Sequence, residues 1–310
     1  MASLQPKKKK HQKLNSAIVF LIAFVLFLLV FGGLCLWAFV RINEERRGEA
    51  SEPASAASQA GPVFTEEDAG NLLVVTVDDS AARGFIVVHS DPLNTRIRTL
   101  AVPRETAVDV GTEQQRLFEL YAKQGVQEAE AAVGRLLGLE FGNYAVITYE
   151  NVEKYISRLS DGLIFTLPED LNYQDPEGKA SIKLEGGPRT LTASQVVNVM
   201  RYPNWYGGRK QQADVQAQLL AALINQYLLP ARDLQSDFET LTGVIQSDIK
   251  ISHFTKAKPG LEYLASRNTE GAICSSVSLE GSYVGTGEAI RFEMADSANS
   301  SLRIVFNNSH

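Results

Sequence analysis

The chain has 310 residues, of which 45% are hydrophobic and 21% charged, and its formal net charge is −6. This apolar content is enough to bury a sizeable core. The two cysteines and the lack of any CxxC or paired His/Cys spacing exclude a disulfide framework and argue against a structural zinc site.

The N-terminal region has the pattern of a membrane anchor. A basic tail over residues 1–16 is followed at residues 17–40 by 24 residues without a charged side chain. At about 1.5 Å per residue this run exceeds the roughly 30 Å hydrocarbon core of a membrane, so it predicts an uncleaved transmembrane signal anchor. The positive-inside rule then predicts a single-pass cell-membrane protein with a cytoplasmic N-terminus and an extracellular C-terminal domain. Small residues at 54–60 leave cleavage as an alternative.

The segment that follows is predicted to be an extracellular stalk over residues 41–70, because it is small, polar and contains proline. Beyond residue 47 the chain holds 22 basic and 34 acidic residues, a charge near −12. A charge of this sign argues against nucleic acid as a partner.

Strand and helix patterns alternate from residue 71 onward. Apolar runs predict a strand over 71–77 and a hairpin over 84–102 with its turn at 91–94. Helical spacing is predicted over 126–137, 149–162, 193–202 (with Thr192 as its N-cap) and 213–229. Further strand character is predicted over 143–149, 163–171, 272–281, 288–295 and 301–307. The alternation predicts an α/β fold with a central mixed sheet flanked by helices.

Acids and arginines gather at the predicted element ends. Two acids close the first strand, one arginine follows them, and the others come after the hairpin, at a helix end and in a glycine-rich loop: Asp78, Asp79, Arg83, Arg104, Arg201 and Arg209. Converging arginines suit phosphate, because a guanidinium group bonds two oxygens at once, and a nearby carboxylate suits Mg²⁺. The alternative is scattered surface charge. No Ser-His-Asp set, Walker A loop or dinucleotide-binding glycine pattern offers another chemistry.

The order of several motifs resembles the LytR-CpsA-Psr family of cell-wall ligases. The resemblance rests on NLLVVTVDDS, VVHSDPLNTRIRTLAVPRET, VGRLLGLEFGNYAVITYENVEKYISRLSDGL, FTLPEDL and LEGGPRTLTASQVVNVMRY. It divides the outer part into a catalytic or binding domain over residues 71–252 and a C-terminal extension with β character over 253–310.

The resemblance implies a membrane-anchored phosphotransferase that attaches a glycopolymer of teichoic-acid or capsule type, carried on polyprenyl pyrophosphate, to peptidoglycan. It implies that the pyrophosphate is bound by Arg83, Arg104, Arg201 and Arg209. Catalytic roles would fall to Arg104, Arg201 and Asp79, and Mg²⁺ would be held by Asp78 and Asp79. Arg104 of PRET matches the phosphate-contacting arginine of the family's PRDT motif, so we expect phosphate rather than Glu105 to balance its charge.

The sequence also departs from the family pattern. Ala81 stands where the family has an arginine, and Arg83 stands where it has an acid used in metal binding or catalysis. Pro203 replaces the second arginine of an Arg-x-Arg pair, and GGRKQQ retains Arg209 but lacks a second arginine. Whether the chain is an enzyme is therefore open. The alternatives are a catalytically degenerate relative, which binds polyprenyl-phosphate lipid or envelope polymer or scaffolds an active partner, and a domain without a ligand.

Overall fold

The computed structural model describes residues 62–306, except 159–160, 176–180 and 231. The predicted basic tail, the predicted span and most of the predicted stalk lie outside these residues. Among the described helices, none combines the length and the apolar character that a membrane crossing requires.

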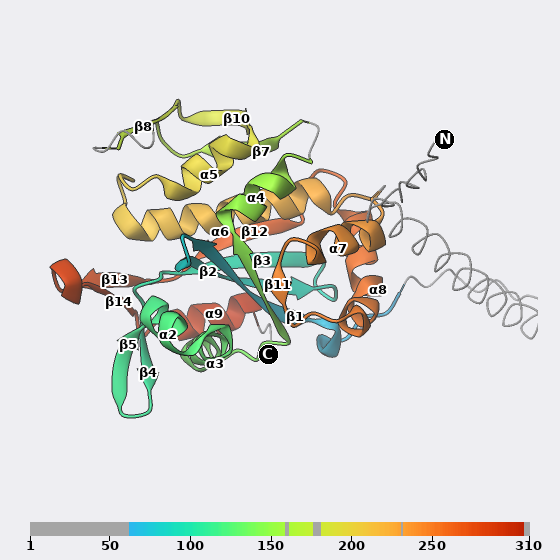
Figure 1. The fold of residues 1–310 in the computed structure, drawn as a ribbon. Helices are drawn as coiled ribbons and strands as arrows, with labels where there is room; N and C mark the ends of the chain where they lie inside the picture. Colours follow the sequence, from blue (N-terminus) through green and yellow to red (C-terminus); the bar gives the residue numbers. More distant parts are fainter. Residues whose placement is uncertain (1–61, 159–160, 176–180, 231, 307–310) are drawn as a thin grey trace, which may run out of the picture. The chain divides into compact units, whose positions relative to one another are not determined.

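A six-stranded mixed sheet forms the centre of the fold (Figure 1). Its strands are β1 (Gly70–Asp78), β2 (Ala81–Asp91), β3 (Arg96–Val102), β6 (Asn143–Thr148), β11 (Gln246–Ser247) and β12 (Cys274–Ser278). Their spatial order is β11-β6-β1-β2-β3-β12. β1 is antiparallel to β2 and parallel to β6, β2 is antiparallel to β3, and β12 is parallel to β3. The predicted central mixed sheet is therefore confirmed.

Tight turns connect the first three strands. Asp79 and Ser80 both have positive φ, at 49° and 64°, as a two-residue hairpin loop whose twist matches its strands requires. The predicted turn after β2 is also present, and there the Asn94 backbone N–H donates to Asp91 Oδ1 over 3.1 Å. The first turn places the end of β1 beside the start of β2, and the second turn lies at the opposite end of these strands.

Helices cover both faces of the sheet (Figure 1). One face carries α2 (Leu117–Gln124), α3 (Val126–Leu137) and α9 (Ala298–Phe306), and the other carries α4 (Tyr149–Ile156), α5 (Ala193–Arg201) and α6 (Gly208–Tyr227). Successive side chains of β2 point to opposite faces of the sheet and pack against the two helical layers alternately. Phe85 and Val87 are buried in the cluster that includes α2 and α3, whereas Ile86 packs with Ala217 of α6.

Smaller elements surround these layers. Two-stranded sheets pair β7 (Leu163–Leu167) with β10 (Gly187–Leu191), β8 (Leu171–Gln174) with β9 (Ser181–Leu184), β4 (Ala107–Val110) with β5 (Glu113–Arg116), and β13 (Gly281–Val284) with β14 (Arg291–Met294). The remaining helices are α7 (Leu234–Thr242), α8 (Ile251–Arg267) and the 3₁₀ turns η1 (Glu66–Asp68) and η2 (Gly287–Ala289).

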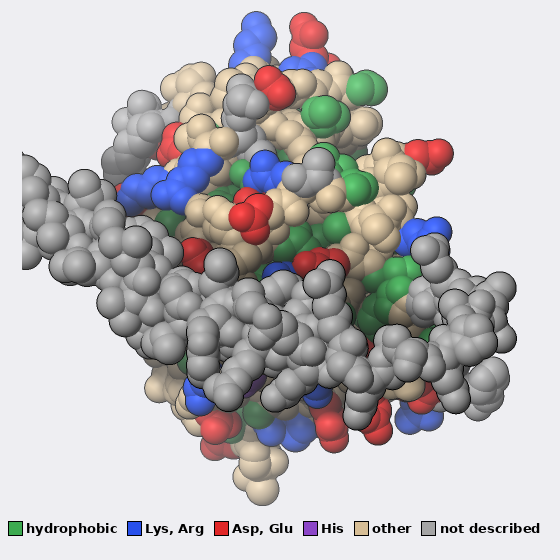
Figure 2. Space-filling view, turned by 90° about the vertical axis from the view of Figure 1, so that its right-hand side faces the viewer, with side chains coloured by type: hydrophobic (Ala, Val, Ile, Leu, Met, Phe, Trp, Pro, Cys, Tyr) green, Lys and Arg blue, Asp and Glu red, His purple; other side chains and the backbone are tan. Residues whose placement is uncertain are grey.

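Along the lower edge of the face shown in Figure 2, acidic and basic side chains are interspersed. Charge alone therefore does not single out a site there.

The structure corrects several predicted elements. The strand predicted over 301–307 is wrong, because the described residues up to 306 belong to α9. Ala298, Leu302 and Phe306 are buried at a spacing of four residues, which is one helix face. The helix predicted over 149–162 ends at Ile156. Thr192 is confirmed as an N-cap, because its side chain accepts the Gln195 N–H.

The predicted boundary at residue 252 falls inside the fold. α8 begins at Ile251, and β12, from the predicted C-terminal extension, joins the central sheet beside β3. The final segment is therefore part of the central architecture.

Replacing Leu100 by alanine tests the central packing. Leu100 on β3 is 0% exposed, and we expect the substitution to lower the free energy of unfolding by about 2–5 kcal/mol, since it leaves a cavity in the main core. Urea denaturation measures the change. The control is Leu93→Ala in the β2–β3 turn, where the side chain is 47% exposed and the cost should be much smaller. Equal losses in the two variants would contradict this packing.

His89 on β2 makes stability depend on pH. Its burial, together with the charges of Arg96 and Arg98 and only partly offset by Asp91, lowers its pKa from 6.5 to about 4. Between pH 6.5 and about 4 the unfolded chain therefore binds more protons at this residue. We expect stability to fall as the pH falls through this range, by on the order of 3 kcal/mol.

Unfolding free energies measured from pH 7 to 4 check this expectation. His89→Gln should flatten the profile, whereas the same replacement of the exposed His253 should not. An unchanged profile in His89→Gln would show that other groups cause the loss.

Candidate functional site

A cavity of about 480 Å³ lies where β1, β3 and β6 end and α4 and α6 begin. Because β1 and β6 are parallel, their C-terminal ends meet at the same edge of the sheet, which is where open α/β folds place ligands. The lining residues are Asp78, Arg83, Arg104, Glu105, Tyr149, Met200, Arg201, Pro203, Arg209, Gln212 and Gln216. The structure thus brings the four predicted arginines around one cavity.

A two-point ion pair joins the end of β1 to the end of α5. Arg201 Nε and Nη2 donate to the two carboxylate oxygens of Asp78 over 2.9 and 2.7 Å. These hydrogen bonds raise the pKa of Arg201, and the nearby charge of Asp79 raises it further. The arginine also lies over the Tyr149 ring, 5.6 Å from its centroid. Arg201 therefore occupies a fixed position at the cavity wall.

Glu105 is a buried carboxylate shared by several groups. Its Oε1 lies 2.8 Å from Arg209 Nη1 and 3.5 Å from Arg104 Nε. Its Oε2 accepts a hydrogen bond from the Tyr283 hydroxyl over 3.2 Å. The expectation that Glu105 does not balance Arg104 is therefore wrong, because the turn after β3 points this carboxylate inward, where only 7% of the side chain is exposed.

Arg104 has an incomplete set of partners. Its guanidinium group lies 4.4 Å from the centroid of the Phe118 ring. Within the described part of the chain, its buried Nε has no hydrogen-bond partner. Burial lowers the pKa of Arg104, Glu105 offsets part of this effect, and the charges of Arg83 and Arg209 lower the pKa further. An anion in the cavity would relieve this unfavourable environment.

Arg83 is the least compensated of the four arginines. It lies in β2, lines the cavity and has a buried Nε without a hydrogen-bond partner among the described residues. Arg209 has a different position from the one predicted. It belongs to the first turn of α6 rather than to a glycine-rich loop.

Tyr149 and Gln216 form an uncharged part of the cavity lining, here called the neutral wall. Gln216 accepts a hydrogen bond from Thr76 Oγ1 and donates one to the Tyr149 hydroxyl, each over 3.3 Å. Burial is the main cause that raises the pKa of Tyr149, so this phenol stays protonated. A β-carbon on Gly84 would lie 2.0 Å from Gln216 Oε1 and 2.8 Å from Thr76 Oγ1, so any larger residue there would displace these side chains.

Several of these residues were not found from the sequence. Tyr149 and Gln216 belong to helices whose pattern signals only packing, and Tyr283 lies far along the chain. The proximity of Glu105 to an arginine was visible in the sequence, but its burial was not.

The predicted Mg²⁺ ligands do not form a ready metal site. Asp78 lines the cavity, but both its oxygens already accept hydrogen bonds from Arg201. Asp79 is exposed in the β1–β2 turn and is not among the lining residues. In the described parts of the chain, no group of three or more His, Cys, Asp or Glu side chains could hold a metal ion. The residues present therefore do not fit Mg²⁺ without first releasing an arginine.

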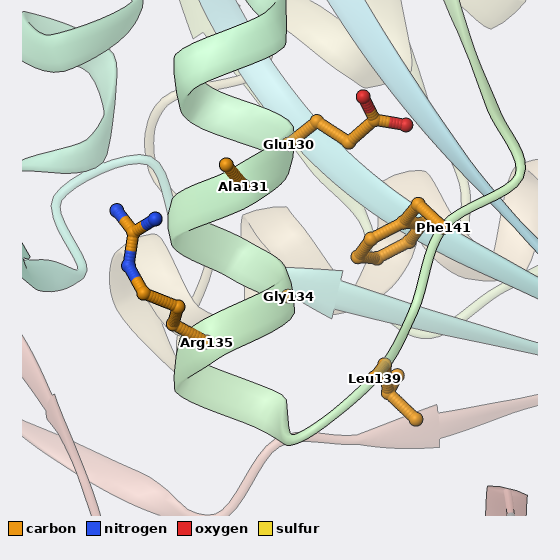
Figure 3. A pocket seen from close by; sticks show the side chains of 6 residues that line it. All are labelled: Glu130, Ala131, Gly134, Arg135, Leu139 and Phe141. Atoms are coloured by element: carbon orange, nitrogen blue, oxygen red, sulfur yellow. The ribbon is translucent and has the colours of Figure 1, made fainter.

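A second hollow, of about 430 Å³, lies beside α3. Figure 3 shows that Glu130 and Arg135 leave the helix in different directions, while Leu139 and Phe141 follow on the adjoining loop. This hollow has no convergent set of charged groups, so the arginine-lined cavity is the stronger candidate.

Comparisons with known proteins identify relatives of the whole domain. The LytR_cpsA_psr family model matches residues 40–298. The polyisoprenyl-teichoic acid–peptidoglycan teichoic acid transferase TagV of Bacillus subtilis (strain 168) is 23% identical over 234 residues, which are 69% of this chain. The chain covers 58% of the length of that relative.

Solved structures show the same fold. The crystal structure of B. subtilis TagV has a TM-score of 0.63 at 19% identity and covers 77% of this chain and 96% of its own. A protein from Eubacterium siraeum DSM 15702 has a TM-score of 0.70 at 13% identity, with coverages of 84% and 100%. A structure of TagT bound to LIIa-WTA has a TM-score of 0.63 at 15% identity, with coverages of 82% and 96%.

Gly84→Ala tests the neutral wall. We expect it to displace Gln216 and to reduce the free energy of unfolding by about 1–3 kcal/mol, because buried hydrogen bonds to Thr76 and Tyr149 would be lost. Thermal or urea unfolding measures this change. In the control Gly70→Ala, no atom lies within 4 Å of the new β-carbon, and stability should change little. If both variants were as stable as the parent, Gln216 would not be fixed here.

Proposed function

Because the chain belongs to the LytR_cpsA_psr (LytR-CpsA-Psr) family, we propose that it is a phosphotransferase acting on a glycopolymer carried by polyprenyl pyrophosphate. The acceptor in this proposal is peptidoglycan, and the polymer is of teichoic-acid or capsule type. The names of the relatives TagV and TagT, a teichoic acid transferase and a protein bound to LIIa-WTA, support this substrate class.

The convergence of four arginines around one cavity carries the proposal. Against two lining carboxylates, the four guanidinium groups leave a surplus of two positive charges. A pyrophosphate diester carries two negative charges, so the surplus is of matching size. The neutral wall of Tyr149 and Gln216 adds uncharged donors and acceptors, which suit sugar or phosphate oxygens.

The chemical step is a phosphoryl transfer. An acceptor hydroxyl oxygen attacks the phosphorus that carries the glycopolymer and forms a new P–O bond. The bond to the bridging oxygen breaks, and polyprenyl phosphate leaves with that electron pair. Arg104 and Arg201 would stabilise the charge on the transferring group, with Arg83 and Arg209 holding the pyrophosphate. Asp79 is exposed in the β1–β2 turn outside the cavity lining, so it is the proposed acceptor of the proton from a hydroxyl that approaches past this turn.

No step of this mechanism passes through Mg²⁺. The expectation of that ion comes from the family resemblance, and the carboxylates lining the cavity are engaged with arginines. The proposed chemistry therefore uses the charges of the chain's own side chains.

We further propose that residues 17–40 anchor the chain in the cell membrane, with the described domain outside. This arrangement rests on the length of the apolar run and on the lysines before it. It would place the cavity in the compartment that holds peptidoglycan.

A second candidate function is binding without transfer. In the described cavity lining, both carboxylates already accept hydrogen bonds, so neither is a free general base. A chain with this lining would hold the carrier lipid or polymer, or present it to an active partner.

Transfer of a radiolabelled glycopolymer precursor from polyprenyl pyrophosphate to peptidoglycan fragments separates the two functions. We expect Arg104→Ala to reduce transfer by about 10²–10³-fold, because one buried cation aimed at the phosphates is lost. The control is Arg135→Ala on the exposed side of α3, which should retain full transfer. The assay is run both with Mg²⁺ and with EDTA.

The outcomes divide the candidates. Transfer that depends on Arg104 supports the enzyme. Carrier binding that depends on Arg104, without transfer under either condition, supports the binding protein. Neither transfer nor binding would contradict both.

A further inference from the structure

We propose that this cavity binds pyrophosphate without a divalent cation and that Arg83 supplies the positive charge in its place. The inference rests on the proposed function, since it concerns how the same cavity holds the carrier's pyrophosphate.

Both carboxylates that line the cavity already accept hydrogen bonds from the protein. Both carboxylate oxygens of Asp78 accept hydrogen bonds from Arg201, over 2.7 and 2.9 Å. One carboxylate oxygen of Glu105 accepts a hydrogen bond from Arg209 over 2.8 Å, and the other accepts one from the Tyr283 hydroxyl. Mg²⁺ requires oxygen ligands in a nearly ideal octahedron, so it would have to displace an arginine or a phenol from one of these acids. Two further cations nearby, Arg83 and Arg104, would repel it.

Arg83 lines the cavity without a charged partner among the described residues. In the described structure it has no ion pair, and its buried Nε has no hydrogen-bond partner. Its charge lowers the pKa of Arg104, so the two guanidinium groups repel each other across the cavity. Arg83 is half-buried and has no ion-pair partner in the described structure, whereas Arg104 has Glu105. A bound anion would pair with Arg83 and reduce the repulsion between the two arginines.

Arg83 lies between two packed neighbours in β2. It precedes Gly84, whose backbone packs against Gln216 and Thr76, and it follows the buried Ala82. The backbone is therefore held on both sides of the arginine, and the side chain starts from a defined position at the cavity. Its guanidinium group can donate two hydrogen bonds to phosphate oxygens, which a metal ion would otherwise take as ligands.

Isothermal titration of the full chain in detergent with farnesyl diphosphate tests the inference. We expect dissociation constants in EDTA and in Mg²⁺ to agree within about threefold, which is well under 1 kcal/mol. Arg83→Ala should weaken binding in EDTA by about 10–100-fold, the range expected for a lost charge-assisted pair, and Arg83→Lys should recover part of it. Arg98→Ala, at another arginine-lined hollow, is the matched control and should bind as the parent does.

Arg83→Asp gives the sharper test. It places a carboxylate beside Asp78, and we expect binding in EDTA to be lost and to return when Mg²⁺ is added. Melting temperatures of all variants confirm that each is folded.

The outcomes separate this inference from the proposed function. Parent binding that requires Mg²⁺ would overturn the inference and leave the proposed function standing. So would an Arg83→Asp variant that binds in EDTA as tightly as the parent. No binding to the parent under either condition would count against both.

Discussion

The cavity depends on one buried carboxylate, that of Glu105. Removing it from water costs several kcal/mol, and the folded chain offsets that cost with Arg209, Arg104 and the Tyr283 hydroxyl. These partners come from the turn after β3, from α6 and from β13, so the ion pairs also hold three distant segments together. Without the negative charge, Arg104 and Arg209 would repel each other. A cavity rich in arginines is thus compatible with a stable fold, because the Glu105 carboxylate neutralises part of their positive charge.

Local patterns predicted what local forces determine. The apolar alternation of β1, β2 and β3, the N-cap at Thr192 and the arginine at the end of α5 follow from periodicity and capping, and the structure has them. The segment around Leu302, Ile304 and Phe306 shows the limit. Its apolar residues alternate as in a strand, yet Ile304 is 72% exposed and the segment is helical. Only its packing against the core selects the helix.

The arginines of the site were predictable from the sequence, but the groups that they contact were not. The sequence marks the arginines at element ends, whereas their partners depend on the assembled topology. Tyr283 reaches Glu105 across 178 positions of the chain, and no local signal connects the two. The fold persists among relatives at 13–23% identity because apolar patterning tolerates wide substitution.

The parallel pairing of β12 with β3 has a consequence for how the chain folds. The bond from Arg98 to Ser275 joins residues 177 positions apart, so the outer edge of β3 has no neighbour until the last part of the chain has been made. At a synthesis rate of about 5–20 residues per second, that edge waits roughly 10–30 s. An unpaired strand edge invites pairing with other chains, and late, distant pairings are slow to form. Because β2 occupies only the inner edge of β3, the nascent domain passes through an interval in which protection of the outer edge, for example by a chaperone, decides between folding and aggregation.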